Sequence, residues 1–205
     1  MSWLTFPPTT IGGFTSNNSW SGITANNYVG GLLTGGVWGN NNPDNGNTTD
    51  LLYYYFPEGY YSSVDVYAYH WSGDEKVAIE NAMGAFSDVA NISFTETYDY
   101  YLANITLASL DKEGTNTLMG TSGEDWLGAA ILPLESAGDY AGLTTVNYEA
   151  YDSYDYSRAL NPGSYHYWVY LHELGHALGF QHVNIKGHIM YPTINGFGPK
   201  FWIPD

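Results

Sequence analysis

Three histidines and a glutamate fall within one short segment, HELGHALGFQH, which runs from His172 to His182. His172 and His176 are four positions apart, so on a helix they lie on one face, one turn from each other. That spacing brings two imidazole nitrogens within reach of a single metal ion. Glu173 follows His172 directly, and its carboxylate can reach a water on that metal without being a ligand itself. The segment therefore predicts a metal site with a general base beside it.

Gly179 and His182 extend this pattern beyond the end of the helix. Glycine tolerates the positive φ with which a chain leaves a helix and turns sharply, and Gly179 stands three residues after His176. The turned chain can bring His182 back as a third ligand. Three neutral histidines leave a fourth position for water, which is the open site that a catalytic zinc requires. Zinc lowers the pKa of that water toward roughly 7, and Glu173 can then accept its proton and pass it to a leaving amine.

The fixed positions of this segment are specific enough to weigh against simpler interpretations. From the residue frequencies of the chain, they match by chance with a probability on the order of 10⁻⁷ per starting point. This argues against a helix whose histidines are merely packed or exposed. Glu173 argues against a structural metal site without catalysis. Two other function classes stay open: a non-catalytic protein-binding module, which would have no chelator-sensitive activity, and a zinc hydrolase of non-peptide substrates.

The segment resembles the long zinc motif of the metzincin metalloproteases, HExxHxxGxxH, at every fixed position. The resemblance implies a zinc metalloendopeptidase with one catalytic zinc held by His172, His176 and His182. Metzincins also place a methionine-containing turn beneath the metal. Met190, in the segment HIMYPT, fits that supporting role, which does not include binding the metal.

Two branches of the metzincins share features with this chain. The phrase FSDVANISFTET (Phe86–Thr97) and the stretch NNYVGGLLTGGVW (Asn26–Trp38) are similar to the serralysin branch. Serralysins carry a tyrosine two residues after the Met-turn methionine, which can act as a further zinc ligand. Pro192 stands there in this chain, and the sequence Met-Tyr-Pro is the matrixin form. We therefore expect a serralysin-like body with a zinc site of three histidines and water, and the role of Tyr191 stays open.

The periodicity of the chain predicts the elements that hold this site. Expected strands are Leu51–Phe56, Ile92–Thr97 and Asn104–Leu110, and expected helices are Ser72–Ala90 and Tyr167–Phe180. This is an α+β arrangement. The resemblance implies a metzincin-type catalytic domain: a twisted, mostly parallel sheet with two main helices and a small lower lobe after the zinc helix. We expect a single domain over residues 1–205, with an upper lobe at about 20–179 and a lower lobe at about 180–205.

A short apolar run, Leu127–Ile131, is a candidate for the strand that binds substrate. Pro133 limits this run to a sheet edge or a strand end. In metzincins the edge strand above the zinc pairs with the substrate backbone. Small residues at Gly128, Ala129 and Ala130 would let a peptide approach closely, although an ordinary buried strand is the alternative. The residues after the Met-turn, Pro192–Ile194, would form the wall of the pocket just beyond the cleaved bond.

Composition narrows the partners and the surroundings of the protein. The net charge of −16 argues against nucleic acids and anionic membranes. The absence of cysteine excludes disulfides and a cysteine that plugs the metal within this chain. The resemblance implies a secreted, monomeric enzyme acting on proteins or peptides, with no export signal visible in the sequence. Calcium binding by Asn40–Asp50 or Asp152–Asp155 is a further possibility, but neither has EF-hand spacing.

Overall fold

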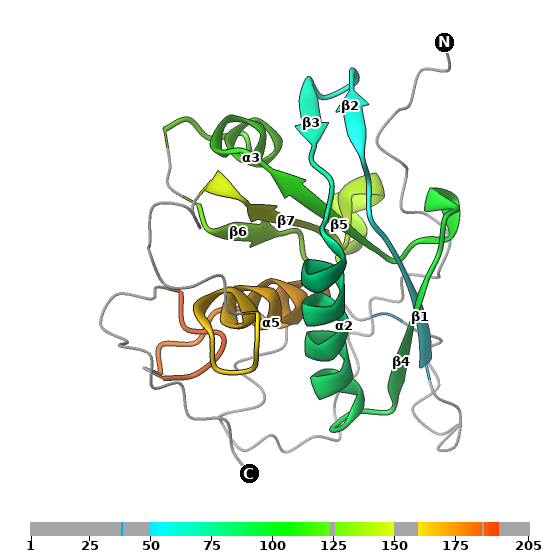
Figure 1. Cartoon of the computed structure of the whole chain (residues 1–205), viewed down its shortest axis with the longest axis vertical. Coiled ribbons are helices and arrows are strands. Elements are labelled where there is room, and N and C mark those ends of the chain that lie inside the picture. Colours follow the sequence, from blue (N-terminus) through cyan, green and yellow to red (C-terminus); the bar gives the residue numbers. More distant parts are fainter. Residues whose placement is uncertain (1–37, 39–49, 124–125, 150–159, 186, 193–205) are drawn as a thin grey trace.

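The computed structural model describes residue 38 and residues 50–123, 126–149, 160–185 and 187–192 (Figure 1). The strands are β1 (Asp50–Tyr55), β2 (Gly59–Tyr61), β3 (Val66–Ala68), β4 (Ile92–Glu96), β5 (Ile105–Leu110), β6 (Gly128–Ala130) and β7 (Leu143–Asn147). The helices are α2 (Gly73–Ser87), α3 (Lys112–Met119) and α5 (Tyr165–Ala177), with 3-10 turns at Tyr100–Leu102 and Glu135–Tyr140. No helix in these ranges is long and apolar enough to cross a membrane.

Five strands form one sheet in the order β4-β1-β5-β7-β6. The first four are mutually parallel, and β6 pairs antiparallel with β7 at the edge. The β2–β3 hairpin and the helix α2 connect the parallel neighbours β1 and β4 and together form the crossover that parallel pairing demands. The expected α+β fold with a mostly parallel sheet is therefore confirmed, and the predicted run at Leu127–Ile131 does contain the edge strand.

The first helix begins where its sequence predicts. Ser72 is the N-cap, and it forms a capping box with Glu75: each side chain accepts a hydrogen bond from the other residue's backbone N–H, at 3.3 and 2.8 Å. Ala78, Ile79, Ala82 and Met83 are the buried residues of this helix. The expected helix Ser72–Ala90 is confirmed, but it is shorter than expected, since α2 ends at Ser87.

Both faces of the sheet are covered, and different elements cover each one. The helices α2 and α5 contact each other and share a large core with strand residues such as Leu52 and Ile105. A second core joins the β2–β3 hairpin to β5 and β7 through residues such as Val66 and Leu143. Every residue of β5 is consequently buried, which is typical of a central parallel strand.

Trp38 connects the N-terminal part of the chain to the zinc-motif helix. Its indole Nε1 donates a 2.6 Å hydrogen bond to the carbonyl of Ala177, the last residue of α5. The ring is buried in the main core, where it also fills the space beside Gly142. Of the serralysin-like stretch Asn26–Trp38, only this residue lies among those described. Trp38 thus satisfies one of the carbonyls that a helix end leaves unpaired.

Candidate active site

The helix that carries the first two histidines is fixed at both ends. Ser164 caps its start by accepting a hydrogen bond from the backbone N–H of Tyr167. At the other end Gly179 has φ 103°, and its N–H bonds to the carbonyl of His176. The N–H of Phe180 bonds to the carbonyl of Gly175, which completes a Schellman motif. The turn predicted at Gly179 is confirmed, and it sends the chain back toward the helix.

The returning chain brings the three histidines of the motif together. The Nε2 atoms of His172, His176 and His182 lie 3.1–3.2 Å from one another. A tetrahedral zinc with Zn–N distances of about 2.0–2.1 Å holds its nitrogens about 3.3–3.4 Å apart. The spacing of the three nitrogens therefore fits a single zinc ion. His70, His166 and His188 are not part of this cluster.

The protonation state of two of these imidazole rings also suits the binding of a metal ion. Nδ1 of His172 donates to the carbonyl of Ile189 at 2.6 Å, and Nδ1 of His176 donates to the carbonyl of Phe180 at 2.7 Å. A carbonyl can only accept, so the neutral rings carry lone pairs on the Nε2 atoms that face each other. Burial lowers the pKa of His172 to about 4 and also lowers the pKa of His176. Facing lone pairs on neutral rings favour a cation between them.

Glu173 points from the same helix toward the edge strand. Its side chain is only 6% exposed, and burial raises its pKa to about 8. A Cβ atom placed on Gly128 of β6 would lie 2.7 Å from Cγ and 2.9 Å from Oε1 of Glu173. The carboxylate therefore occupies the space that a side chain at this position of β6 would fill. A buried carboxylate with a raised pKa, beside a metal-ligand cluster, is suited to accept and release a proton.

Met190 lies directly under the helix between the histidine positions. It is 1% exposed, and a Cβ on Gly175 would come within 2.5 Å of its Sδ atom. Its carbonyl accepts a hydrogen bond from the N–H of Val183, which ties the turn to the segment carrying His182. Tyr191 is half-buried and Pro192 is exposed. Thr193 and Ile194 of the predicted pocket wall lie outside the described residues, as do residues 40–49 and 152–155 of the calcium candidates.

Trp168 is a contact of the site that the sequence interpretation missed. Its ring stacks on His172 with centroids 4.9 Å apart and an interplanar angle of 24°. The two residues are four positions apart on α5, so helical spacing alone could have indicated the contact. The stack supplies an apolar wall that, with the carbonyl of Ile189, fixes the orientation of the imidazole. Supporting contacts of this kind orient metal ligands before the metal binds.

The twisted sheet, the two core helices and a glycine-turned triad of histidines define a protein of the metzincin class. Comparison with known proteins gives the family. The model of the matrixin family, peptidase family M10, matches residues 63–203. This chain belongs to that family.

Three curated proteins are similar in sequence to this chain. Karilysin of Tannerella forsythia is 25% identical over 171 residues, which are 83% of this chain and 31% of that protein. Matrix metalloproteinase-18 of Xenopus laevis is 29% identical over 134 residues, 64% of this chain and 27% of its own length. The hatching enzyme of Paracentrotus lividus is 28% identical over 130 residues, 62% of this chain and 20% of its own length. The chain thus spans between a fifth and a third of these relatives.

The contact between Gly128 and Glu173 can be tested by adding a single methyl group. Gly128→Ala would push a Cβ against Glu173 and within 2.9 Å of the carbonyl of Thr145, so the strand or the carboxylate must shift. We expect peptide hydrolysis to fall at least tenfold, bound zinc to stay, and the free energy of unfolding to drop by about 1–3 kcal/mol. Initial rates, metal analysis and urea denaturation measure the three effects.

The matched control is Gly84→Ala inside α2, where an added Cβ meets nothing within 4 Å. An alanine at this helix position should stabilise the protein by about 0.5–1 kcal/mol and leave the rate unchanged. Equal rates for the two alanine variants would contradict the assigned position of Glu173.

Proposed function

We propose that this chain is a zinc-dependent endopeptidase in which His172, His176 and His182 hold one zinc ion and Glu173 is the general base. The observation that carries the proposal is the meeting of the three Nε2 atoms within 3.2 Å beside a buried carboxylate of the same helix. Membership of the matrixin family supports the same reaction. The reaction is the hydrolysis of peptide bonds within proteins or peptides.

A bound zinc ion would supply a Lewis acid that lowers the pKa of water toward roughly 7. Glu173 takes the proton from the attacking water and delivers it to the nitrogen of the leaving amine. Its apolar surroundings raise its pKa, and a base whose pKa lies near the working pH both accepts and releases a proton readily. His172 and His176 are kept in one tautomer by the carbonyls of Ile189 and Phe180 and therefore present Nε2 without rearrangement.

The edge strand β6 is suited to hold the substrate. Within the described residues it pairs only with β7, and strand edges bind extended peptides through backbone hydrogen bonds. We assign Gly128, Ala129 and Ala130 to this role, with Glu173 directly beside Gly128. Small side chains at these positions allow the substrate backbone to approach both the strand and the base.

Met190 is assigned the support of the zinc site from below, because it fills the space beside Gly175 between the two helical histidines. The sequence Met-Tyr-Pro at this turn agrees with the matrixin family. The serralysin-like phrase Phe86–Thr97 suggests that the body of the chain is related to that branch as well. With Pro192 in place of a tyrosine, the zinc site is proposed to consist of three histidines and water.

The remaining assignments follow from the family. We propose one catalytic domain over residues 1–205, with an upper lobe at about 20–179 and a lower lobe at about 180–205. The enzyme would act outside the cell as a monomer on protein or peptide substrates. Calcium as a second, structural ion stays a prediction for the acidic segments outside the described residues.

Removal of the metal tests this function. Dialysis against a zinc chelator is expected to abolish cleavage of casein, and stoichiometric zinc should restore it, because the three histidines supply the only metal-ligand cluster within the described ranges. A casein zymogram run with and without chelator, alongside metal analysis, makes the measurement. Zinc binding without any cleavage would instead favour a non-catalytic binding module, and full activity after zinc removal would refute a zinc-dependent mechanism.

A further inference from the structure

A row of tyrosines crosses the outer face of the β2–β3 hairpin. Alternate residues of the hairpin point in opposite directions: Val66 and Ala68 are buried in the second core, whereas Tyr60 and Tyr67 are 54% and 49% exposed. Tyr60 and Tyr67 are cross-strand partners. The row continues from Tyr67 to Tyr69 with ring centroids 4.9 Å apart. This side of the hairpin is therefore an aromatic surface and not a covered one.

The row continues beyond the hairpin onto the end of the main sheet. The rings of Tyr69 and Tyr148 lie 4.4 Å apart between their centroids, and Tyr148 directly follows β7. Four tyrosines, Tyr60, Tyr67, Tyr69 and Tyr148, thus form one continuous group, which we call the tyrosine ladder. Its members come from three separate stretches of the chain, so the ladder is a product of the fold and not of local sequence.

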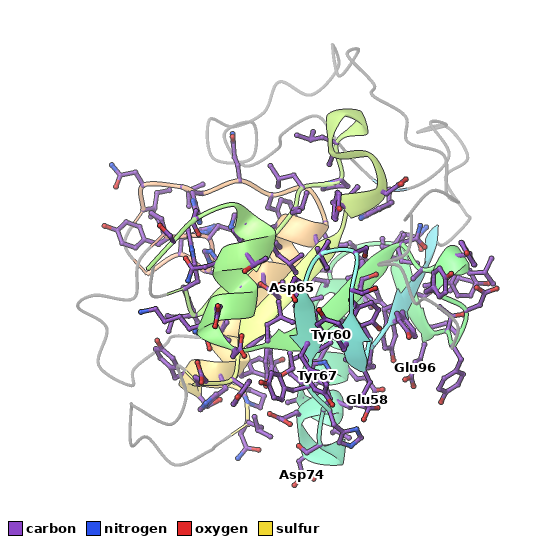
Figure 2. The ribbon with its side chains drawn as sticks, turned by 90° about the horizontal axis from the view of Figure 1, so that it is seen from above. Glu58, Tyr60, Asp65, Tyr67, Asp74 and Glu96 are labelled. Carbon is purple, nitrogen blue, oxygen red and sulfur yellow. The ribbon has the colours of Figure 1, made fainter. Side chains whose placement is uncertain are left out.

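Carboxylates stand at the edges of these rings and hold their hydroxyl groups. Tyr60 Oη donates to Asp65 Oδ1 at 2.6 Å, and Tyr69 Oη donates to Asp111 Oδ2 at 3.1 Å. The hydrogen bond that Tyr60 donates to Asp65 raises the pKa of Tyr60, and the ring is neutral at ordinary pH. Figure 2 shows Asp65, Tyr60, Tyr67 and Glu58 gathered on the hairpin. Neutral ring faces beside anionic groups attract cations.

A polar pocket adjoins the ladder at Asp111. Its volume is about 490 Å³, and its lining includes Asp111, Glu113, Asn116 and Glu149. Glu149 accepts a hydrogen bond from the backbone N–H of Lys112 at 3.1 Å and lies next to Tyr148 in the chain. Lys112 is the single basic side chain in the pocket lining. Three carboxylates against one ammonium leave the pocket with an excess of negative charge.

The chain itself contains a small example of the same recognition. Lys76 Nζ lies 4.5 Å from the centroid of the Phe56 ring and 3.3 Å from Glu96 Oε1. An aromatic face and a carboxylate together hold this ammonium group. The ladder offers the same pair of groups several times over, and the whole protein has 21 acidic residues against 5 basic ones. Charge complementarity therefore selects a cationic partner for this surface.

We propose that the tyrosine ladder and the adjoining acidic pocket form a docking surface for lysine- and arginine-rich polypeptide segments. Arginine and lysine side chains stack on exposed tyrosine faces, while the carboxylates of Asp65, Asp111 and Glu149 pair with their charges. The surface lies apart from the histidine cluster, on the hairpin face of the sheet (Figure 1). The role of this surface in capturing basic protein substrates rests on the proposed endopeptidase function. The binding of basic segments does not depend on that function.

Binding can be measured without any hydrolysis. The probe is fluorescein-labelled nona-arginine made of D-amino acids, which a peptidase does not cleave, and fluorescence anisotropy is recorded against the full chain loaded with zinc. We expect saturable binding that weakens as salt rises. The double variant Tyr60→Ala/Tyr67→Ala should weaken it roughly tenfold, because each exposed cation–π contact contributes about two- to fivefold. Tyr60→Phe/Tyr67→Phe keeps the ring faces and should bind within about twofold of the wild type.

A charge control separates this surface from the general acidity of the protein. Asp65→Asn preserves the backbone, since asparagine also tolerates the φ of 54° found at this residue, and it should weaken binding severalfold. Asp88→Asn removes an equal charge at the far end of α2 (Figure 1) and should leave binding unchanged. Thermal unfolding of each variant verifies that it is folded.

Three results would overturn the proposal: unchanged binding in the alanine double variant, equal losses in Asp65→Asn and Asp88→Asn, or tyrosine-dependent binding of a neutral oligosaccharide in place of nona-arginine. If docking serves catalysis, the alanine double variant should raise KM for a casein-derived peptide carrying an arginine tail and leave kcat unchanged. If the alanine double variant binds nona-arginine more weakly but keeps its KM, the surface binds basic segments without contributing to substrate capture. If the wild-type protein hydrolyses no peptide, the proposed function is refuted, whereas the anisotropy measurement of binding is unaffected.

Discussion

Glu173→Gln is expected to abolish peptide hydrolysis while zinc stays bound. Glutamine has the same size as glutamate and fits the space beside Gly128. In that space Glu173 Oε1 lies 2.9 Å from the point that a Cβ atom on residue 128 would occupy. The amide cannot take a proton from water, and loss of a general base lowers rates by roughly 10²–10⁴. The ligands His172, His176 and His182 are unchanged. Initial rates on a fluorogenic peptide and zinc content by atomic absorption make the measurement.

Stability gives this variant an independent readout. Glu173 is a buried carboxylate whose pKa is raised by desolvation, so its charged form is unfavourable in the zinc-free protein. A neutral amide removes that penalty, and the zinc-free variant should unfold at the same or a higher denaturant concentration at pH above 8. The sign follows because the pKa of Glu173 is higher in the folded than in the unfolded chain. The folded state therefore loses stability as the pH rises from the unfolded pKa through the folded one. A lower midpoint would show that Glu173 makes a contact that Gln cannot replace.

The matched control for both measurements is Glu80→Gln on α2. Glu80 accepts a 3.0 Å hydrogen bond from Tyr54 Oη, and the amide oxygen of glutamine can accept the same bond. Its activity should equal that of the wild type. The general-base assignment fails if Glu173→Gln retains more than about a tenth of the wild-type rate, since such a small loss is below what a base contributes.

The sequence predicted the parts of this protein that depend on local spacing. The separation of His172 and His176 by one helical turn and the glycine turn at Gly179 both follow from backbone geometry, and both are confirmed. The start of α2 at Ser72 is similarly local, because Ser72 caps the helix together with Glu75 three positions later. These features need only the few residues around them, so a single sequence is enough to recognise them.

The elements that the sequence did not predict depend on distant partners. The strand β7, LTTVN, is buried along its whole length and therefore lacks the alternation that marks a half-exposed strand. The helix α3 contains a glycine and two threonines, which are poor helix formers, and it is held by the side chain of its N-cap Asp111 and by packing on β3, β5 and β7. Tertiary contacts override local propensity in both elements.

Two further features, one in the histidine site and one outside it, also required the fold. Gly128 was interpreted as room for a substrate, but its nearest neighbour in space is Glu173, from a helix more than forty residues away in sequence. The strand that carries Gly128 stays assigned to substrate binding, because among the described residues it pairs only with β7 and folding brings Glu173 beside it. The tyrosine ladder is similar: Tyr67 and Tyr148 are linked through Tyr69 by pairings that no sequence pattern indicates.

Removal of one histidine is expected to remove zinc and its contribution to stability together. In His176→Ala two nitrogens remain, and the Nδ1 bond to the carbonyl of Phe180 at 2.7 Å is lost. That bond contributes only about 1 kcal/mol, so the zinc-free variant should be nearly as stable as the zinc-free wild type. Zinc at 100 to 1,000 times its Kd stabilises a folded protein by about 2.7–4.1 kcal/mol, which corresponds to roughly 5–15 °C in Tm for a chain of this size.

We therefore expect zinc to raise the Tm of the wild type by that amount and to leave the Tm of His176→Ala almost unchanged, with no detectable hydrolysis. His70→Gln is the matched control, because His70 is exposed and, among the described residues, pairs with Glu58 at 3.1 Å. It should respond to zinc as the wild type does. Differential scanning calorimetry with and without zinc makes the comparison. An equal zinc-induced shift in His176→Ala would place the metal somewhere other than the histidine cluster, since a ligand that binds only the folded state cannot stabilise a chain that has lost its site.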